Sequence, residues 1–193
     1  MYSVKDKKQK TLYIIAGANG SGKTTFALNF AKVKSLDFVN ADEIAKEYDP
    51  QDIQKYKITA GKVFFQRVNE RLLKHDSFML ETTLSGKYLE KVIRRAQKAG
   101  FFISLIYLYL DNSVENVLRV KNRVLAGGHN VPEIDIIRRY MRSKNLFLSL
   151  YKDLVDEWSL FYNGDDKFEL IANNQMVIDE ITYNNFLKDV QYE

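Results

Sequence analysis

A glycine-rich string between a short apolar run and a helical segment constrains the fold of this chain more than any other feature. Residues 12–16 are apolar, and they are followed by Gly17, Ala18, Asn19, Gly20, Ser21, Gly22, Lys23, Thr24 and Thr25. The first eight of these match G-x-x-x-x-G-K-[ST] in full, in the strand-then-helix context that the pattern requires. Backbone N–H groups of such a loop form a nest for phosphate, and the helix N-terminus adds partial positive charge. We therefore expect these nine residues to bind ATP, with Lys23 on the β- and γ-phosphates and the Thr24 hydroxyl on Mg²⁺.

The rest of the chain alternates short apolar runs with longer helical patterns. Strands are expected at residues 12–16, 37–40, 77–81, 101–110 and 168–172, with a short extra strand at 176–178. Helices are expected between them, including one that Ser113 caps and one that continues from Pro132 to about Trp158, and a last helix over 181–190. Such alternation predicts βαβ units, hence an α/β fold with a parallel sheet of about five strands flanked by helices. A chain of 193 residues suits one domain, so we expect a single domain over 1–193.

Composition excludes several classes of protein. Hydrophobic residues make up 46% of the chain and 25 residues are aromatic, which excludes a disordered chain. The absence of cysteine excludes disulfides, thiolate metal sites and cysteine nucleophiles. The longest apolar run, residues 101–110, is about half of the ~20 residues that a membrane span needs. The apolar run near the N-terminus is too short for a signal peptide, so we expect a cytoplasmic protein without a membrane partner.

Positive charge is concentrated in one window. Between Arg119 and Lys144 there are seven Lys and Arg residues against two acidic ones, so the window carries +5 while the whole chain carries +4. Arg119 and Arg123 share a helix face, and arginine forks neutralise the charge that spreads over a γ-phosphate during transfer. With Gly127-Gly128 as a hinge, residues 119–145 are expected to form a basic lid that excludes water. For any single arginine here, a solvated basic face is the alternative, and His129 is equally explained as a turn residue.

Two carboxylates follow predicted strands, where ligands of open parallel sheets bind. Asp42 comes after residues 37–40, and it is placed to orient an acceptor hydroxyl and take its proton. The alternative is that Asp42 only caps the helix that follows. Glu81 ends the strand at 77–81, where it would bind a Mg²⁺-bound water or the substrate, unless it is merely an exposed strand end.

These motifs together resemble the zeta-toxin-like P-loop kinases, and in particular the branch described as predicted ATPases. The resemblance runs over residues 11–173 and rests on the phosphate loop, the strand that ends Asn-Ala-Asp at Asp42, the string Glu-Thr-Thr-Leu-Ser-Gly at 81–86, and the string Gly-Gly-His-Asn-Val-Pro-Glu at 127–133 followed by Ile-Arg-Arg-Tyr at 137–140. It implies a fold related to adenylate kinase, with Lys23 and Thr24 as ATP and Mg²⁺ residues.

The resemblance also implies roles around the acceptor. Asp42 would be the base, Glu81 and Thr83 would contact the acceptor, and Arg119, with Arg123 as a neighbouring candidate, would assist ATP. His129 falls where the toxins have an arginine, and we place it among the substrate contacts. The acceptor of the characterised toxins is UDP-N-acetylglucosamine, and an inhibitory antitoxin is a further partner that the resemblance implies.

The sequence leaves three functions open. The first is an ATP-dependent kinase of a small hydroxylated acceptor, which the Asp42, Glu81 and Thr83 set favours. The second is a nucleotide-binding regulator or nucleic-acid-associated ATPase that uses its basic face for polyanions. The third is a nucleic-acid 5′-hydroxyl kinase, which needs aromatic stacking. Tyr140 and Phe147 would have to supply that stacking, but both fit the helix core better, so nucleic acid is not the expected partner.

Overall fold

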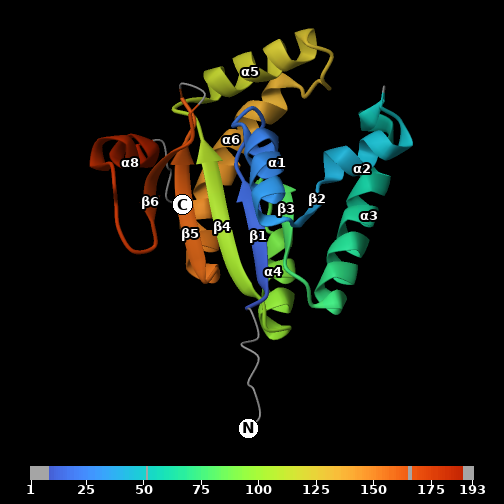
Figure 1. Cartoon of the computed structure of the whole chain (residues 1–193). Helices are drawn as coiled ribbons and strands as arrows, with labels where there is room; N and C mark the ends of the chain where they lie inside the picture. The colour runs from blue at the N-terminus through green and yellow to red at the C-terminus, as the bar shows by residue number, and fades with distance from the viewer. Residues whose placement is uncertain (1–8, 51, 165–166, 189–193) are drawn as a thin grey trace.

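A computed structural model of the chain describes residues 9–50, 52–164 and 167–188 (Figure 1). In this part of the chain the strands form one six-stranded sheet in the order β2-β3-β1-β4-β5-β6. Neighbouring strands are parallel from β2 to β5, whereas β6 is antiparallel to β5. The strands are β1 (Thr11–Ala16), β2 (Asp37–Val39), β3 (Phe78–Thr82), β4 (Phe102–Tyr109), β5 (Glu157–Tyr162) and β6 (Glu169–Asn173).

Helices connect the strands and cover both faces of the sheet. They are α1 (Lys23–Lys34), α2 (Ala41–Tyr48), α3 (Ile53–Lys74), α4 (Tyr88–Lys98), α5 (Ser113–Leu125), α6 (Glu133–Leu146) and α8 (Glu180–Leu187). Helix α6 continues through a π-helical turn (Phe147–Tyr151) into the short α7 (Lys152–Leu154). None of the helices in the described ranges is both long enough and apolar enough to span a membrane.

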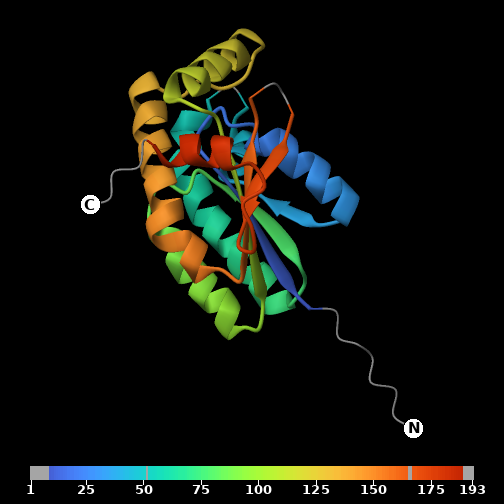
Figure 2. The same cartoon turned by 90° about the vertical axis from the view of Figure 1, so that its left-hand side faces the viewer.

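Alternating side chains of β1 divide the core into two layers. Ile15 packs with the α1 residue Ala27 on one face of the sheet. Leu12 and Ile14 pack on the other face with residues of α3, α4 and the π-helical turn that follows α6. Figure 2 shows α1 on one side of the sheet and α3, α4 and α6 on the other. Strand β4 is buried on both faces, as its unbroken apolar run predicts.

The sheet confirms the predicted α/β class, but the last third of the chain differs from the prediction. The predicted helix from Pro132 to about Trp158 ends at Leu154, and Glu157–Tyr162 forms strand β5. The Asp156 carboxylate accepts a hydrogen bond from the Ile103 backbone N–H at 2.7 Å, which fixes the start of β5 beside β4. The sheet therefore has six strands instead of about five, and its last strand is antiparallel.

Three smaller predictions also need correction or fall outside the described residues. The expected extra strand at 176–178 is reduced to one bridge, between Ala172 and Val177. Helix α5 is capped by Asn112, whose side chain accepts from the Glu115 N–H at 3.0 Å, and not by Ser113, which is its first residue. The last helix ends at Leu187, and the end of its predicted range, 189–190, lies outside the described residues.

Candidate functional site

The glycine-rich string forms a tight loop between β1 and α1. Gly20 and Gly22 have φ values of 85° and 87°, a region that side chains rarely adopt. A Cβ atom on Gly20 would lie 2.5 Å from the Asn116 carbonyl oxygen, and one on Gly22 would collide with the Asn163 side chain. Backbone conformation and lack of space therefore both require glycine at these positions.

Three side chains whose role in the loop the sequence did not reveal hold the loop from outside. Asn116, from α5, donates to the Asn19 carbonyl oxygen at 2.7 Å. Asn163, which follows β5, donates to the Ser21 carbonyl oxygen at 3.1 Å. Arg139, from α6, donates to the Asn19 side-chain oxygen at 3.1 Å. The loop is thus tied to α5 and α6, which contain most of the predicted lid, and to the residue that follows β5.

Lys23 lies buried at the base of the loop, and only 6% of it is exposed. Its ammonium donates to the Ala18 carbonyl oxygen at 2.7 Å. Burial lowers the pKa of Lys23, while the nearby carboxylates of Glu81 and Asp42 raise it. The two carboxylates therefore stabilise a lysine charge that burial disfavours.

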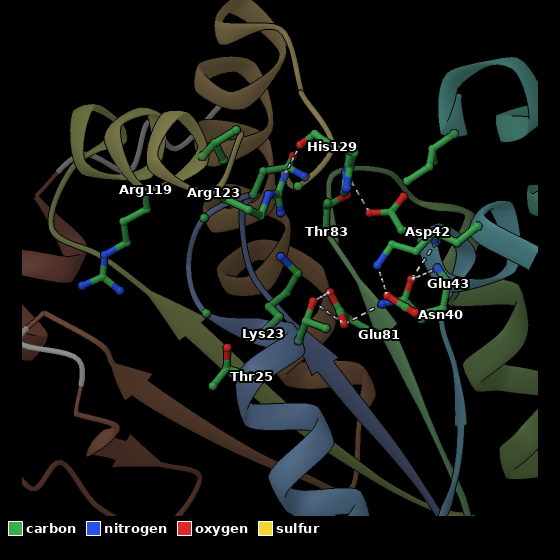
Figure 3. A pocket seen from close by; sticks show the side chains of 18 of the residues that line it. Lys23, Thr25, Asn40, Asp42, Glu43, Glu81, Thr83, Arg119, Arg123 and His129 are labelled. Atoms are coloured by element: carbon green, nitrogen blue, oxygen red, sulfur yellow. Dashed lines mark hydrogen bonds and ion pairs between the residues drawn. The ribbon is translucent and has the colours of Figure 1, made fainter. Parts of the chain in front are cut away.

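Glu81 is the centre of a hydrogen-bond network that joins the end of β3 to the start of α1 and to the residue after β2. Thr24 Oγ1 lies 3.1 Å from both carboxylate oxygens, and Asn40 Nδ2 donates to Oε2 at 2.7 Å (Figure 3). Burial raises the pKa of Glu81, and Lys23 opposes that shift. Glu81 is therefore not an exposed strand end, which was the alternative for this residue.

The oxygen pair of Thr24 and Glu81 suits a hard cation such as Mg²⁺. A hydroxyl and a carboxylate are hard ligands, and Mg²⁺ in nucleotide sites binds one or two protein oxygens together with phosphate. Among the described residues there is no group of three or more His, Cys, Asp or Glu side chains that could hold a metal by itself. The site therefore suits a cation that phosphate groups help to bind.

Asn40, and not Asp42, caps helix α2. The Asn40 side-chain oxygen accepts hydrogen bonds from the backbone N–H groups of Asp42 at 2.7 Å and Glu43 at 3.2 Å. The cap alternative for Asp42 is therefore wrong, and its half-exposed carboxylate faces the cavity beside Glu81 (Figure 3).

His129 lies opposite Asp42, on the loop between α5 and α6. Its Nε2 atom is 3.5 Å from Asp42 Oδ2, and its own carbonyl oxygen accepts from Arg123 at 3.0 Å. Burial lowers the pKa of His129, and the Asp42 carboxylate opposes this. Burial likewise lowers the pKa of Arg123, and the nearby carboxylates of Asp42 and Glu81 oppose this shift.

The two predicted lid arginines point in different directions. Arg123 faces the Asp42 side, whereas Arg119 donates to the carbonyl oxygens of Asn163 at 2.8 Å and Gly164 at 2.6 Å (Figure 3). The solvated-face alternative describes Arg138, which is half-exposed and pairs with Asp135 at 2.7 Å.

Two aromatic side chains, one in the predicted lid and one just after it, can be assigned to the core. Tyr140 is 5% exposed and Phe147 is fully buried, so neither is available to stack on a base. The stacking requirement of a nucleic-acid 5′-hydroxyl kinase is therefore not met by these two residues.

Two cavities, each of about 350 Å³, meet at the carboxylates. The first lies between the phosphate loop and the predicted lid. It brings together all the predicted site residues except Gly17, Ala18 and Ser21, which lie in the loop outside the lining. The second lies between α3 and the segment that follows β3. The two cavities share five of their lining residues: Asn19, Asn40, Asp42, Glu81 and Thr83.

Comparison with known sequences identifies a family over most of the chain. The family model described as Zeta toxin matches residues 2–175. A protein of Haemophilus influenzae (strain ATCC 51907 / DSM 11121 / KW20 / Rd) is 30% identical over 132 residues, which are 68% of this chain and 94% of that protein.

Comparison with solved structures supports the same fold. A chain from the PezAT chromosomal toxin–antitoxin system of Streptococcus pneumoniae superposes with a TM-score of 0.67 at 15% identity, over 98% of this chain and 82% of that one. A chain of the AvrRxo1-ORF1:-ORF2 complex with ATP gives a TM-score of 0.74 at 15% identity, over 97% and 66% of the two chains. At these identities the likeness concerns the fold.

Proposed function

Because this chain belongs to the zeta toxin family of P-loop kinases, we propose that it transfers the γ-phosphoryl group of ATP to a hydroxyl of a small acceptor. The observation that carries the proposal is the meeting of two cavities at Asp42, Glu81 and Thr83. A kinase must hold two substrates with their reacting atoms in contact. A regulator that only binds nucleotide has no need of the second cavity.

In this proposal the first cavity holds ATP. Residues 17–25 bind its phosphates, and Lys23 neutralises charge on the β- and γ-phosphates. Thr24 and Glu81 would hold Mg²⁺, which when bound neutralises charge on the phosphate oxygens. Residues 119–145 act as a lid of the same domain. Its Arg123 faces the carboxylates, and Arg119 lies beside Asn163 and Gly164 at the far end.

The second cavity holds the acceptor, with its hydroxyl at Asp42. The acceptor oxygen forms a bond to the γ-phosphorus while the bond to the leaving ADP oxygen breaks. The hydroxyl proton passes to the Asp42 carboxylate, so charge and atoms balance. Thr83, which lines both cavities, would contact the acceptor. His129 lines only the first of the two, but it lies 3.5 Å from Asp42 and would contact the acceptor near its reacting hydroxyl.

The identity of the acceptor and of any partner protein extends the proposal. Family membership makes UDP-N-acetylglucosamine the first acceptor to test. The solved relatives come from a toxin–antitoxin system and from a two-protein complex, which makes an antitoxin the first partner to seek. These roles place the protein in the cytoplasm, where ATP and nucleotide sugars are available.

The experiment is incubation of the full chain with labelled ATP, Mg²⁺ and a panel of nucleotide sugars, sugars and oligonucleotides, analysed by mass spectrometry. We expect one small molecule to gain a phosphoryl group with the wild type. We expect none to do so with Lys23→Ala, which also binds ATP less tightly because a buried cation is lost. ATP binding without transfer to any acceptor would favour the regulator, and transfer only to oligonucleotides would favour the nucleic-acid kinase.

A further inference from the structure

A glycine interrupts the middle of helix α3 without a packing reason. Gly61 has an ordinary helical conformation, and a Cβ atom built on it would meet nothing within 4 Å. Glycine weakens a helix interior relative to alanine, so open space at this position calls for an explanation. Gly61 lies on one helix face with Lys57, Phe64 and Phe65, and all four line the second cavity. The missing side chain therefore enlarges that cavity.

Aromatic rings form the apolar part of the cavity lining. The Phe65 and Tyr88 rings lie 5.6 Å apart at 89°, and they are 38% and 45% exposed. The Tyr88 hydroxyl forms a hydrogen bond with Thr82 Oγ1 at 2.7 Å. The Phe65 ring packs on the ring of the buried Phe64, with 5.4 Å between their centroids. Both rings are therefore held in place while part of their surface stays open. Such a wall suits the apolar face of a ring.

Two cations line the same cavity. The Lys57 ammonium makes no hydrogen bond or ion pair with any residue in the described ranges. Arg139 is only 18% exposed along its side chain and is oriented by Asn19 at 3.1 Å and by Asp135 at 3.9 Å. Both cations also line a neighbouring cavity of about 90 Å³ that Asp42 and His129 border. A group that reaches this corner of the cavity comes near both cations and near Asp42, the carboxylate that receives the hydroxyl proton in the proposed function.

We propose that the second cavity selects acceptors in which one ring carries both the reacting hydroxyl and an anionic group. Lys57 and Arg139 bind the anionic group, Phe65 and Tyr88 pack against the ring, and Gly61 leaves the space that the ring fills. A volume of about 350 Å³ is near the lower end of the range for ligand sites, roughly 300–1,000 Å³, and it suits a single substituted ring. The inference rests on the proposed function, because that function assigns this cavity to the acceptor. A carboxylate and a phosphate share the required chemistry.

The first test measures binding without transfer. Cyclohexanecarboxylate, cyclohexyl phosphate and the neutral cyclohexanecarboxamide are titrated into the full chain and followed by ligand-observed NMR. We expect the two anions to bind the wild type about three- to ten-fold more tightly than the amide, as partly exposed charge pairs allow. The stronger of the two anions identifies the preferred group. Equal binding of the amide, or no binding of any of the three compounds, would overturn the proposal.

Variants then assign the effect to the cavity. Lys57→Gln should remove most of the preference for the anions, whereas Lys62→Gln, a lysine of the same helix outside the lining, should keep it. Gly61→Leu should weaken all three compounds about ten-fold or more while ATP affinity stays unchanged, and its Tm should rise because glycine leaves the helix. If Gly61→Leu binds all three compounds as the wild type does, the cavity is not the site.

A transfer assay separates this inference from the function on which it rests. D-Glucose, D-glucuronate, glucose 6-phosphate and UDP-N-acetylglucosamine are compared as acceptors with labelled ATP. Transfer to neutral glucose as fast as to the anionic sugars would contradict the inference and leave the kinase intact. Anion-selective binding that Gly61→Leu abolishes, together with no transfer to any acceptor in this or a wider panel, would instead contradict the kinase.

Discussion

Asn40 is the side chain on which both helix α2 and the Glu81 carboxylate depend. Its oxygen caps α2 through the N–H groups of Asp42 and Glu43, and its nitrogen donates to Glu81 at 2.7 Å. Only 6% of the residue is exposed. Three substitutions separate the two functions, because serine and aspartate cap helices about as well as asparagine and alanine does not.

The magnitudes follow from the bonds that each substitution removes. Asn40→Ser keeps the cap but cannot reach Glu81, and losing a hydrogen bond to a charged group costs about 2 kcal/mol. Asn40→Ala also loses the cap, about 1 kcal/mol more. In a protein of this size these changes lower Tm by about 4–8 °C and 6–12 °C.

Asn40→Asp keeps the cap but replaces the donor to Glu81 with a second carboxylate. The two carboxylates share a site, so the pKa of one of them rises in the folded protein. Protons are then bound more tightly in the folded state, and stability is lost as pH rises from about 4 through that raised pKa. This variant should be closest to the wild type near pH 4–5 and furthest from it near pH 8.

Thermal and urea unfolding of the three variants at pH 5 and pH 8 tests this reasoning. The account requires Asn40→Ser to be more stable than Asn40→Ala, and Asn40→Asp to gain on the wild type as pH falls. An Asn40→Asp variant as stable as the wild type at pH 8 would refute the contact with Glu81. Equal stability of the serine and alanine variants would refute the cap.

Three further predictions concern the loop and the lid. Gly20→Ala should lower both Tm and ATP affinity, measured by thermal unfolding with and without ATP, because its Cβ would lie 2.5 Å from the Asn116 carbonyl oxygen; normal ATP binding would contradict the loop geometry. Arg119→Ala and Arg123→Ala should each lower kcat more than ATP affinity, with the larger loss for Arg123, which faces Asp42 and Glu81; steady-state kinetics would contradict this if both kept full kcat. Burial lowers the pKa of His129 below its ordinary 6.5, so the contribution of the neutral imidazole to stability is complete above pH 6.5 and is lost as pH falls towards the lowered pKa. His129→Gln should therefore lose less stability than the wild type between pH 7 and pH 5, as measured by urea unfolding.

The parts of the site that follow a local sequence pattern could be predicted from the sequence alone. The phosphate loop has a fixed spacing, and the structure places it between β1 and α1 as predicted. Asp42 follows one strand and Glu81 lies at the end of another, and the carboxyl ends of parallel strands lie at the same edge of a sheet, so a shared location could be inferred without coordinates.

The remaining features depend on contacts between distant residues. Strand β5 was predicted as the end of a helix because the apolar residues from Phe147 to Trp158 also fit helical spacing. The helix ends after a π-helical turn, and the hydrogen bond from the Ile103 N–H to the Asp156 carboxylate fixes the start of β5. Neither feature has a recognisable sequence pattern. The asparagines that support the site, Asn116 and Asn163, are single polar residues whose partners lie 97 and 142 positions away.

The central claim is that Asp42 receives the proton of an acceptor hydroxyl during phosphoryl transfer from ATP. Because Asn40 caps α2 and Asp42 is half-exposed, Asp42→Asn should fold normally, with a stability change within about 1 kcal/mol from the lost charge in the first helical turn. Glu43→Gln is the matched control, since that carboxylate is in the same turn, lines the same cavity and pairs with Lys46 at 2.6 Å.

The decisive measurement is the rate of labelled phosphoryl transfer to the acceptor by the wild type, Asp42→Asn and Glu43→Gln at equal ATP saturation. The account predicts a fall of roughly 10²-fold or more for Asp42→Asn, with unchanged ATP binding, and little change for Glu43→Gln. Equal rates for the wild type and Asp42→Asn would contradict the account.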